Sequence, residues 1–266
     1  MKVAAYQMKV GADMEANFRR IRKAIERAAE EGAQLLALPE CAVPGYPPHH
    51  WKRRDEVDTA RAAELNAETA QLASENSIHV VLGTILMSSE GLLNSALVIS
   101  NEGEILGRYD KLHLMSDDKK FFVGGVGART FEVGGLTMGV LICYDARFPE
   151  PFRYLRECGA QMIVIISNAC GADTWKVPVL EGTYRARAAE NTCFVVAVNA
   201  AGPLQMATSR IVDPLGLDLA SANYDHEEML FAEIDLSETE QGCFYDRRSD
   251  QFELRAKFDC GLRSEE

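Results

Sequence analysis

The sequence predicts an α/β protein in which two β-sheets pack together and helices cover their outer sides. Short apolar runs typical of buried strands alternate with amphipathic segments in both halves of the 266-residue chain. Paired strands with intervening helices in each half favour two packed sheets. The composition, 47% hydrophobic and 26% charged, is typical of a globular domain. No linker interrupts the pattern, so we expect one domain over residues 1–266, with a C-terminal tail from about residue 243.

The first half begins with a predicted buried strand at residues 2–9. A helix is expected from about Met14 to Glu31, because Phe18, Ile21 and Ile25 share one face and Gly32 ends the pattern. A short apolar strand then finishes at Glu40. Residues 44–48 are too rich in proline for regular structure and predict a loop. The remaining elements are a helix at 59–76 and strands at 78–87, 93–99 and 104–109.

The second half repeats this alternation of strands and helices. Helices are expected near 149–158 and from about Trp175 to Asn191. The predicted strands lie near 129–133, 136–143, 162–166, 193–199, 208–212, 217–220 and 229–234. The tail after Gly242 lacks periodicity, and we expect it to reach a partner subunit.

Cys143 is the cysteine best placed for chemistry. It ends the apolar run 136–142, where a buried strand is predicted to turn into a helix. Backbone N–H groups converge at such a junction and favour negative charge, which would lower the pKa of the thiol and bind an oxyanion. The alternative is a small buried hydrophobic side chain, the more usual role of a cysteine at the end of a buried strand.

Two further charged residues also lie at predicted strand ends. Glu40 ends the run 33–40, and Lys111 follows the strand near 104–109. Because strand ends line the usual crevice of an open α/β sheet, these side chains could meet Cys143 there. Alternatively, Glu40 is a surface charge and Lys111 pairs with Asp110 in solvent.

These segments together resemble the nitrilase superfamily of carbon–nitrogen hydrolases. The matching stretches are Leu-Pro-Glu at 38–40, Tyr-Asp-Lys-Leu-His-Leu at 109–114 and Leu-Ile-Cys-Tyr-Asp-Ala-Arg-Phe-Pro-Glu at 141–150. Further matches lie at 185–191, 198–202 and 209–216, and the resemblance runs from residue 3 to about residue 248. It implies a four-layer αββα sandwich of two mixed β-sheets with outer helices.

The resemblance also implies a mechanism of amide hydrolysis. Cys143 would be the nucleophile and Glu40 the general base, while Lys111 and the backbone N–H of Tyr144 would stabilise the oxyanion. Loss of ammonia would leave a thioester on Cys143, which water activated by Glu40 would hydrolyse. Related proteins form dimers or larger assemblies, so a homodimer or larger homo-oligomer is expected.

The region 117–125 departs from the family pattern. Many relatives carry a second glutamate there, and aligning Phe121, Phe122 and Gly125 with that pattern puts Asp118 at its position. Aspartate is one methylene shorter, so Asp118 either reaches the site or belongs to a solvated charge run.

Substrate-lining candidates come from loops and strand ends near the three residues. They are Tyr46, Tyr144, Asn168, Ala169 and Trp175. Tyr144 and Trp175 could equally be packing residues. Arg147 could bind a substrate carboxylate or pair internally with an acidic side chain. The segment around Cys143 resembles amide hydrolases acting on small aliphatic or dicarboxylic ω-amides.

The leading function is an amidase acting on a small carboxamide. The alternatives are an N-carbamoyl amine or amino acid amidohydrolase, a nitrilase, and a catalytically silent binding protein on the same fold. Product analysis separates the first two, because carbamoyl hydrolysis releases carbon dioxide as well as ammonia.

Composition argues against several other classes. A net charge of −12 disfavours nucleic acid or anionic membrane as a partner. The sequence shows no 18-residue apolar run and no signal-peptide pattern, so we expect a cytoplasmic protein. Seven cysteines without C-x-x-C pairing favour free thiols. The histidines show no ligand-like grouping, and His49-His50 is expected to be a polar loop, so neither a metal nor a cofactor is predicted.

Overall fold

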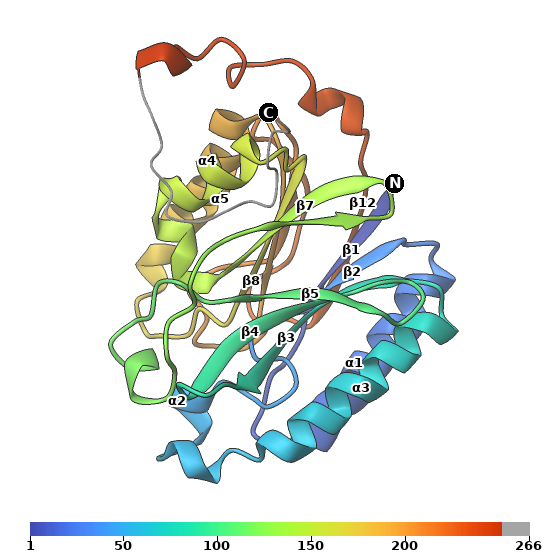
Figure 1. The fold of residues 1–266 in the computed structure, drawn as a ribbon, viewed down its shortest axis with the longest axis vertical. Helices are drawn as coiled ribbons and strands as arrows, with labels where there is room; N and C mark the ends of the chain where they lie inside the picture. The colour runs from blue at the N-terminus through green and yellow to red at the C-terminus, as the bar shows by residue number, and fades with distance from the viewer. Residues whose placement is uncertain (252–266) are drawn as a thin grey trace.

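The computed structural model describes residues 1–251, and two six-stranded sheets form its centre. Helices lie on the outer side of each sheet, which gives four layers (Figure 1). The predicted αββα sandwich is therefore confirmed. Each sheet has three parallel strands at its middle and antiparallel strands at its edges, so both sheets are mixed.

The first sheet is built from the N-terminal part of the chain and one late strand. Its strands, in spatial order, are β12 (Glu228–Glu233), β1 (Lys2–Gln7), β2 (Leu35–Ala37), β3 (His79–Met87), β4 (Leu92–Ile99) and β5 (Ile105–Asp110). Strands β1, β2 and β3 run parallel. The pairing of β1 with β12 closes the sheet with the end of the fold and ties the two halves of the chain together.

The second sheet has the same plan. Its spatial order is β11 (Asp218–Ser221), β10 (Arg210–Val212), β9 (Phe194–Asn199), β8 (Met162–Ser167), β7 (Leu136–Ile142) and β6 (Thr130–Val133). Strands β7, β8 and β9 run parallel. All six residues of β8 are buried, as expected for a central parallel strand covered on both faces.

Two long helices cover the first sheet, and two others cover the second (Figure 1). Helix α1 (Met14–Glu30) and helix α3 (Thr59–Glu75) pack side by side, and each is capped by an aspartate that accepts a backbone N–H. Helix α4 (Pro149–Glu157) and helix α5 (Val177–Asn191) lie on the opposite side of the sandwich. The apolar stripe of each helix is thereby removed from water.

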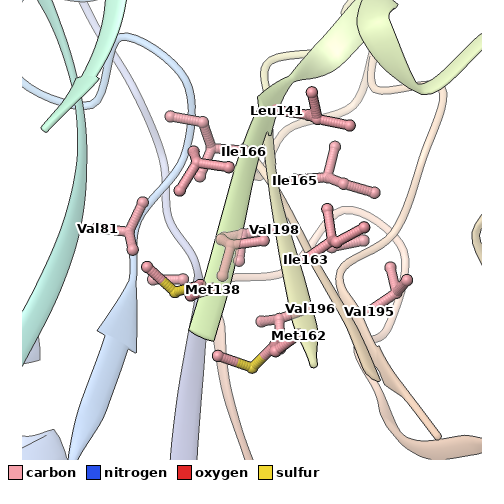
Figure 2. Packing of buried hydrophobic residues seen from close by; sticks show 14 of the residues in the cluster. Val81, Met138, Leu141, Met162, Ile163, Ile165, Ile166, Val195, Val196 and Val198 are labelled. Carbon is pink, nitrogen blue, oxygen red and sulfur yellow. The ribbon is translucent and has the colours of Figure 1, made fainter. Parts of the chain in front are cut away.

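The main core lies between the two sheets. In Figure 2, Val81 of β3 points toward Met138 of β7 across this interface. Residues on the other face of the second sheet point away from the interface, toward α4 and α5; they are Leu141, Ile163, Ile165 and Val195. This alternation explains why the strands are apolar throughout, since both faces are buried.

Three local expectations need correction. Residues Pro47–His50 form a short helix, α2, because a proline suits the first helical position. The turn after β7 is a 3-10 helix, η3 (Cys143–Arg147), so the strand does not turn directly into an α-helix at Cys143, while α4 begins at Pro149 as expected. Helix α5 begins at Val177, after a separate 3-10 turn at Thr174–Lys176.

The described part of the tail packs on its own chain. The ring of Phe244 lies against the guanidinium groups of Arg153 and Arg156, at 5.3 and 4.8 Å from the ring centre. Arg156 also donates to the hydroxyl of Tyr245. Phe244 and Tyr245 thus pack against α4, whereas residues 252–266 of the predicted tail lie outside the described residues. Contact of the tail with a partner subunit stays a prediction.

Candidate active site

Four strand ends meet at one edge of the sandwich. Glu40 follows β2, Cys143 follows β7, Asn168 follows β8 and Lys111 follows β5. The backbone N–H of Asn168 donates to Glu40 Oε2 over 2.7 Å, so the two sheets are in direct contact at this point. The sequence expectation that Glu40 and Lys111 meet at strand ends agrees with the geometry.

Glu40, Lys111 and Asp118 form a buried ionic cluster. The Lys111 ammonium lies 2.8 Å from Glu40 Oε1 and 2.8 Å from Asp118 Oδ2. None of the three side chains is exposed. The hydroxyl of Tyr46 and the backbone N–H of Met115 donate to Asp118. Asp118 therefore reaches the site despite its shorter side chain, and the solvated charge run is excluded.

Cys143 lies at the sharp turn between β7 and η3. Its φ is +48°, in the left-handed region that a non-glycine residue adopts only when the surrounding structure holds it there. A strained strand-to-helix turn of this kind projects a nucleophile out of the sheet edge. The residue is partly buried and lines a cavity of about 130 Å³.

Burial dominates the electrostatics of the thiol. Removal from water raises the pKa of Cys143 well above its ordinary value, and the Glu40 carboxylate raises it further. Lys111 opposes both effects. The lowered pKa expected from the strand–helix junction was therefore wrong, because desolvation and a neighbouring carboxylate outweigh the backbone dipoles. A thiol whose pKa is raised in this way forms the thiolate less readily than a free cysteine.

Lys111 shows the opposite balance. Burial alone lowers the pKa of its ammonium, but the carboxylates of Glu40 and Asp118 raise it well above its ordinary value. The lysine is thus held as a cation, and its side chain is fully buried. A fixed positive charge in such a site is suited to stabilising a developing oxyanion.

Two glycines allow the backbone to place Glu40 and Lys111. A Cβ at Gly83 of β3 would lie 1.9 Å from the carbonyl oxygen of Pro39, so the segment before Glu40 can rest directly on the sheet. A Cβ at Gly125 would lie 2.1 Å from the carbonyl oxygen of Asp110. The N–H of Gly125 donates to the carbonyl oxygen of Lys111 over 2.8 Å. Close approach of backbone requires glycine at both positions.

The cavity is lined by most of the substrate-site candidates. Tyr46, Tyr144, Asn168 and Ala169 all contribute to its wall, and so does Arg147. Trp175 does not line it: this side chain is 66% exposed and lies beside the ammonium of Lys176. The 3-10 turn before α5 directs Trp175 to the surface and brings Lys176 to the cavity instead.

Sequence reasoning missed three contributors to this region. Asn94 of β4 donates to Glu40 Oε1 over 2.7 Å, and a single amide in the apolar run 92–99 was the available signal. His49 and Cys170 line the cavity from opposite sheets, with Nε2 and Sγ 3.1 Å apart. His49 lies on α2 and lines the cavity, so the expectation that it belongs to a polar loop was wrong. Nothing in its sequence context indicated the contact.

Two further findings concern the cysteines and the helices. Cys41, Cys143, Cys158, Cys170, Cys193 and Cys243 are free thiols, and Cys260 lies outside the described residues. Among residues 1–251, no helix has the length and apolar character needed to cross a membrane.

Comparison with known proteins agrees with this geometry. Residues 2–242 match the carbon-nitrogen hydrolase family. A nitrilase from Pyrococcus abyssi is 32% identical over 89% of this chain and 90% of its own. The 2-oxoglutaramate amidase of Bacillus subtilis is 30% identical over 84% of this chain and 86% of its own.

A solved structure extends the comparison to three dimensions. It is a variant of the amidase from Nesterenkonia sp. AN1, in which acrylamide has undergone Michael addition at the active-site cysteine. It is 26% identical and superimposes with a TM-score of 0.83 over 94% of this chain and 98% of that one.

The sandwich of two mixed sheets, with a thiol beside a buried carboxylate and ammonium, defines an enzyme of the nitrilase superfamily. The chain belongs to the carbon-nitrogen hydrolase family, in its amidase-like branch, and is an amide-hydrolysing enzyme.

Proposed function

We propose that this enzyme hydrolyses a small carboxamide to a carboxylic acid and ammonia through a thioester on Cys143. One observation carries the proposal: Cys143 lines a small cavity, and the buried Glu40–Lys111–Asp118 cluster lies close enough behind it to shift the pKa of its thiol. The raised pKa of Cys143 makes a base necessary, and Glu40 is the carboxylate that acts most strongly on this thiol.

The hydrogen bonds of Glu40 indicate which oxygen takes the proton. Oε1 already accepts from Lys111 and Asn94, while Oε2 accepts, among residues 1–251, only from the N–H of Asn168. A carboxylate oxygen has two acceptor positions, so Oε2 keeps one free. In the proposed first step, the Cys143 proton moves to Oε2 as sulfur attacks the amide carbon.

The remaining steps return that proton. Negative charge develops on the amide oxygen, where Lys111 and the backbone N–H of Tyr144 stabilise it. The carbon–nitrogen bond breaks as Glu40 gives its proton to the leaving nitrogen, which departs as ammonia. Water, deprotonated by Glu40, then attacks the thioester carbon, and the carbon–sulfur bond breaks as Glu40 returns that proton to sulfur, which releases the acid and restores the thiol.

Arg147 supports a narrower class of substrate. It lines the cavity and forms no ion pair with any other residue in 1–251. The similar amidase from Bacillus subtilis acts on 2-oxoglutaramate, which carries a carboxylate at the end opposite its amide. We therefore infer an aliphatic ω-amide whose carboxylate pairs with Arg147.

A panel of amides tests the proposal. The wild-type enzyme and Cys143→Ala would be incubated with 2-oxoglutaramate, butyramide, an N-carbamoyl amino acid and an aliphatic nitrile. Ammonia, carbon dioxide and intact protein mass would be measured. Ammonia from amides, with an acyl adduct present only when Cys143 is, supports the proposal. Turnover of the carbamoyl compound alone, turnover of the nitrile alone, or silence across the panel would contradict it.

A further inference from the structure

The carboxylate of Asp145 is an unusual feature of the turn that carries Cys143. It is fully buried two residues after the nucleophile, in η3. Its Oδ2 accepts from the backbone N–H of Ile142 at 3.1 Å and from the hydroxyl of Tyr109 at 2.7 Å. Its Oδ1 accepts from the backbone N–H of His113 at 2.9 Å and lies 2.7 Å from His113 Nδ1.

The partners of Asp145 come from both sides of the sandwich. Ile142 is the last residue of β7 and directly precedes Cys143. Tyr109 and His113 stand two residues before and two residues after Lys111. A single carboxylate therefore connects the turn that carries the thiol to the segment that carries the ammonium.

The direction of the side chains explains how this connection is made. Successive residues of a strand point to opposite faces, so Tyr109 and Lys111 leave the chain on the same side. Both are at most 1% exposed. His113 is held a second time, because its ring stacks on Phe148 with centres 3.9 Å apart. Tyr109, before Lys111 in the sequence, and His113, after it, thus both attach this segment to the turn that carries Cys143.

We propose that Asp145 is a positioning residue that holds the Lys111 ammonium in a fixed position relative to the Cys143 thiol. The Ile142 hydrogen bond supports the left-handed backbone at Cys143, and the bonds to Tyr109 and His113 set where Lys111 enters the site. Without these bonds the two sheets can shift relative to each other at this edge. The role in catalysis rests on the proposed function, since it supposes that Lys111 and Cys143 act on one carbonyl.

Two substitutions test this role. Asp145→Asn keeps the shape of the side chain but replaces one carboxylate oxygen by an NH2 group. This NH2 group would face N–H or O–H donors, so hydrogen bonds that Asp145 accepts would be lost. Tyr109→Phe removes only the hydroxyl that bridges the sheets. We expect kcat to fall about 100-fold and about 10-fold respectively, with KM within about twofold of wild type, because a small misplacement affects the transition state most.

Thiol chemistry supplies a readout that needs no amide substrate. The rate at which iodoacetamide alkylates Cys143 would be followed against pH by mass spectrometry of its peptide. Because Lys111 favours the thiolate, its displacement should slow alkylation at neutral pH and move the midpoint of the profile upward. Tyr6→Phe is the matched control, since the Tyr6 hydroxyl also contacts a carboxylate, that of Glu227, 3.4 Å away in a part of the fold outside the cavity.

The outcomes distinguish a positioning role of Asp145 from a purely stabilising role, and they distinguish failure of this proposal from failure of the proposed function. An unchanged alkylation profile and unchanged kcat in folded Tyr109→Phe would overturn the proposal, whether or not Asp145→Asn folds. So would a loss of activity that only follows the fraction of folded protein. A shifted profile in an enzyme that hydrolyses no amide would retain the positioning role and reject the amidase mechanism.

Discussion

The backbone N–H of Asn168 donates to Glu40 over 2.7 Å, and this bond joins the first sheet to the second at the active-site edge. Glu40 follows β2 and Asn168 follows β8, so neither sheet alone contains the site. The side chain that we propose as the base is therefore held by both halves of the molecule, and relative movement of the sheets would displace it.

Removing the Lys111 charge should damage both stability and activity. Lys111→Met leaves two buried carboxylates without their cation, and we expect a loss of about 3–5 kcal/mol in the free energy of unfolding. Urea denaturation would measure it. Lys120→Met, which breaks an exposed pair with Asp117, is the control and should leave stability nearly unchanged.

The same residue predicts an alkaline limit of stability. The pKa of Lys111 is raised in the folded protein, so the ammonium stabilises the fold fully below its unfolded value of about 10.4. That contribution is lost as pH rises through the folded pKa. Lys111→Met should therefore show a weaker decline in stability than wild type above about pH 10. Parallel declines would show that the folded pKa of Lys111 is not raised.

Asp118 should tolerate neither neutralisation nor lengthening. Asp118→Asn weakens the bond that holds the Lys111 ammonium, and we expect kcat to fall about 100-fold. Asp118→Glu restores the residue type of many relatives but adds a methylene to a fully buried site, which costs about 1–3 kcal/mol. Steady-state kinetics and thermal unfolding would measure the two effects. Full activity of Asp118→Asn would exclude a role for its charge.

A methyl group at position 83 should displace Glu40, the proposed base. In Gly83→Ala the added Cβ would overlap the Pro39 carbonyl oxygen, so the segment leading to Glu40 must move. We expect loss of stability by at least about 1–3 kcal/mol and loss of most activity. Gly182→Ala in α5 is the matched control: apart from the neighbouring backbone of the helix, no atom of residues 1–251 lies within 4 Å of its Cβ, and helix propensity favours alanine by about 1 kcal/mol. Equal behaviour of the two variants would contradict the prediction.

Arg147 should determine the preference for charged amides. In Arg147→Met we expect the KM for 2-oxoglutaramate to rise about 10–100-fold, the equivalent of one charge-assisted hydrogen bond. The KM for butyramide, which lacks a carboxylate, should change less than about twofold. Arg185→Met, which removes a guanidinium paired with Asp218 outside the cavity, serves as control. An equal rise for both amides would indicate that Arg147 shapes the cavity without recognising charge.

The sequence alone predicted the order of the strands and of the longer helices, and it indicated that Glu40 and Lys111 could meet. Periodic apolar runs end abruptly at these residues and at Cys143, and strand ends of an α/β fold converge on one edge. Asp118 was undecided in the sequence, because the reach of a side chain depends on how its loop folds. The pKa of Cys143 was predicted in the wrong direction, since burial by the other sheet is invisible along the chain.

Only the tertiary structure decided how the two sheets are locked together at the site. The contacts of Asn168 with Glu40 and of Tyr109 with Asp145 join residues 128 and 36 positions apart. Hydrogen bonds of this kind depend on distance and angle within tenths of an ångström, and no local pattern encodes such geometry. Local periodicity therefore placed each residue on its strand, whereas the packing of one sheet on the other set the distances on which the proposed chemistry depends.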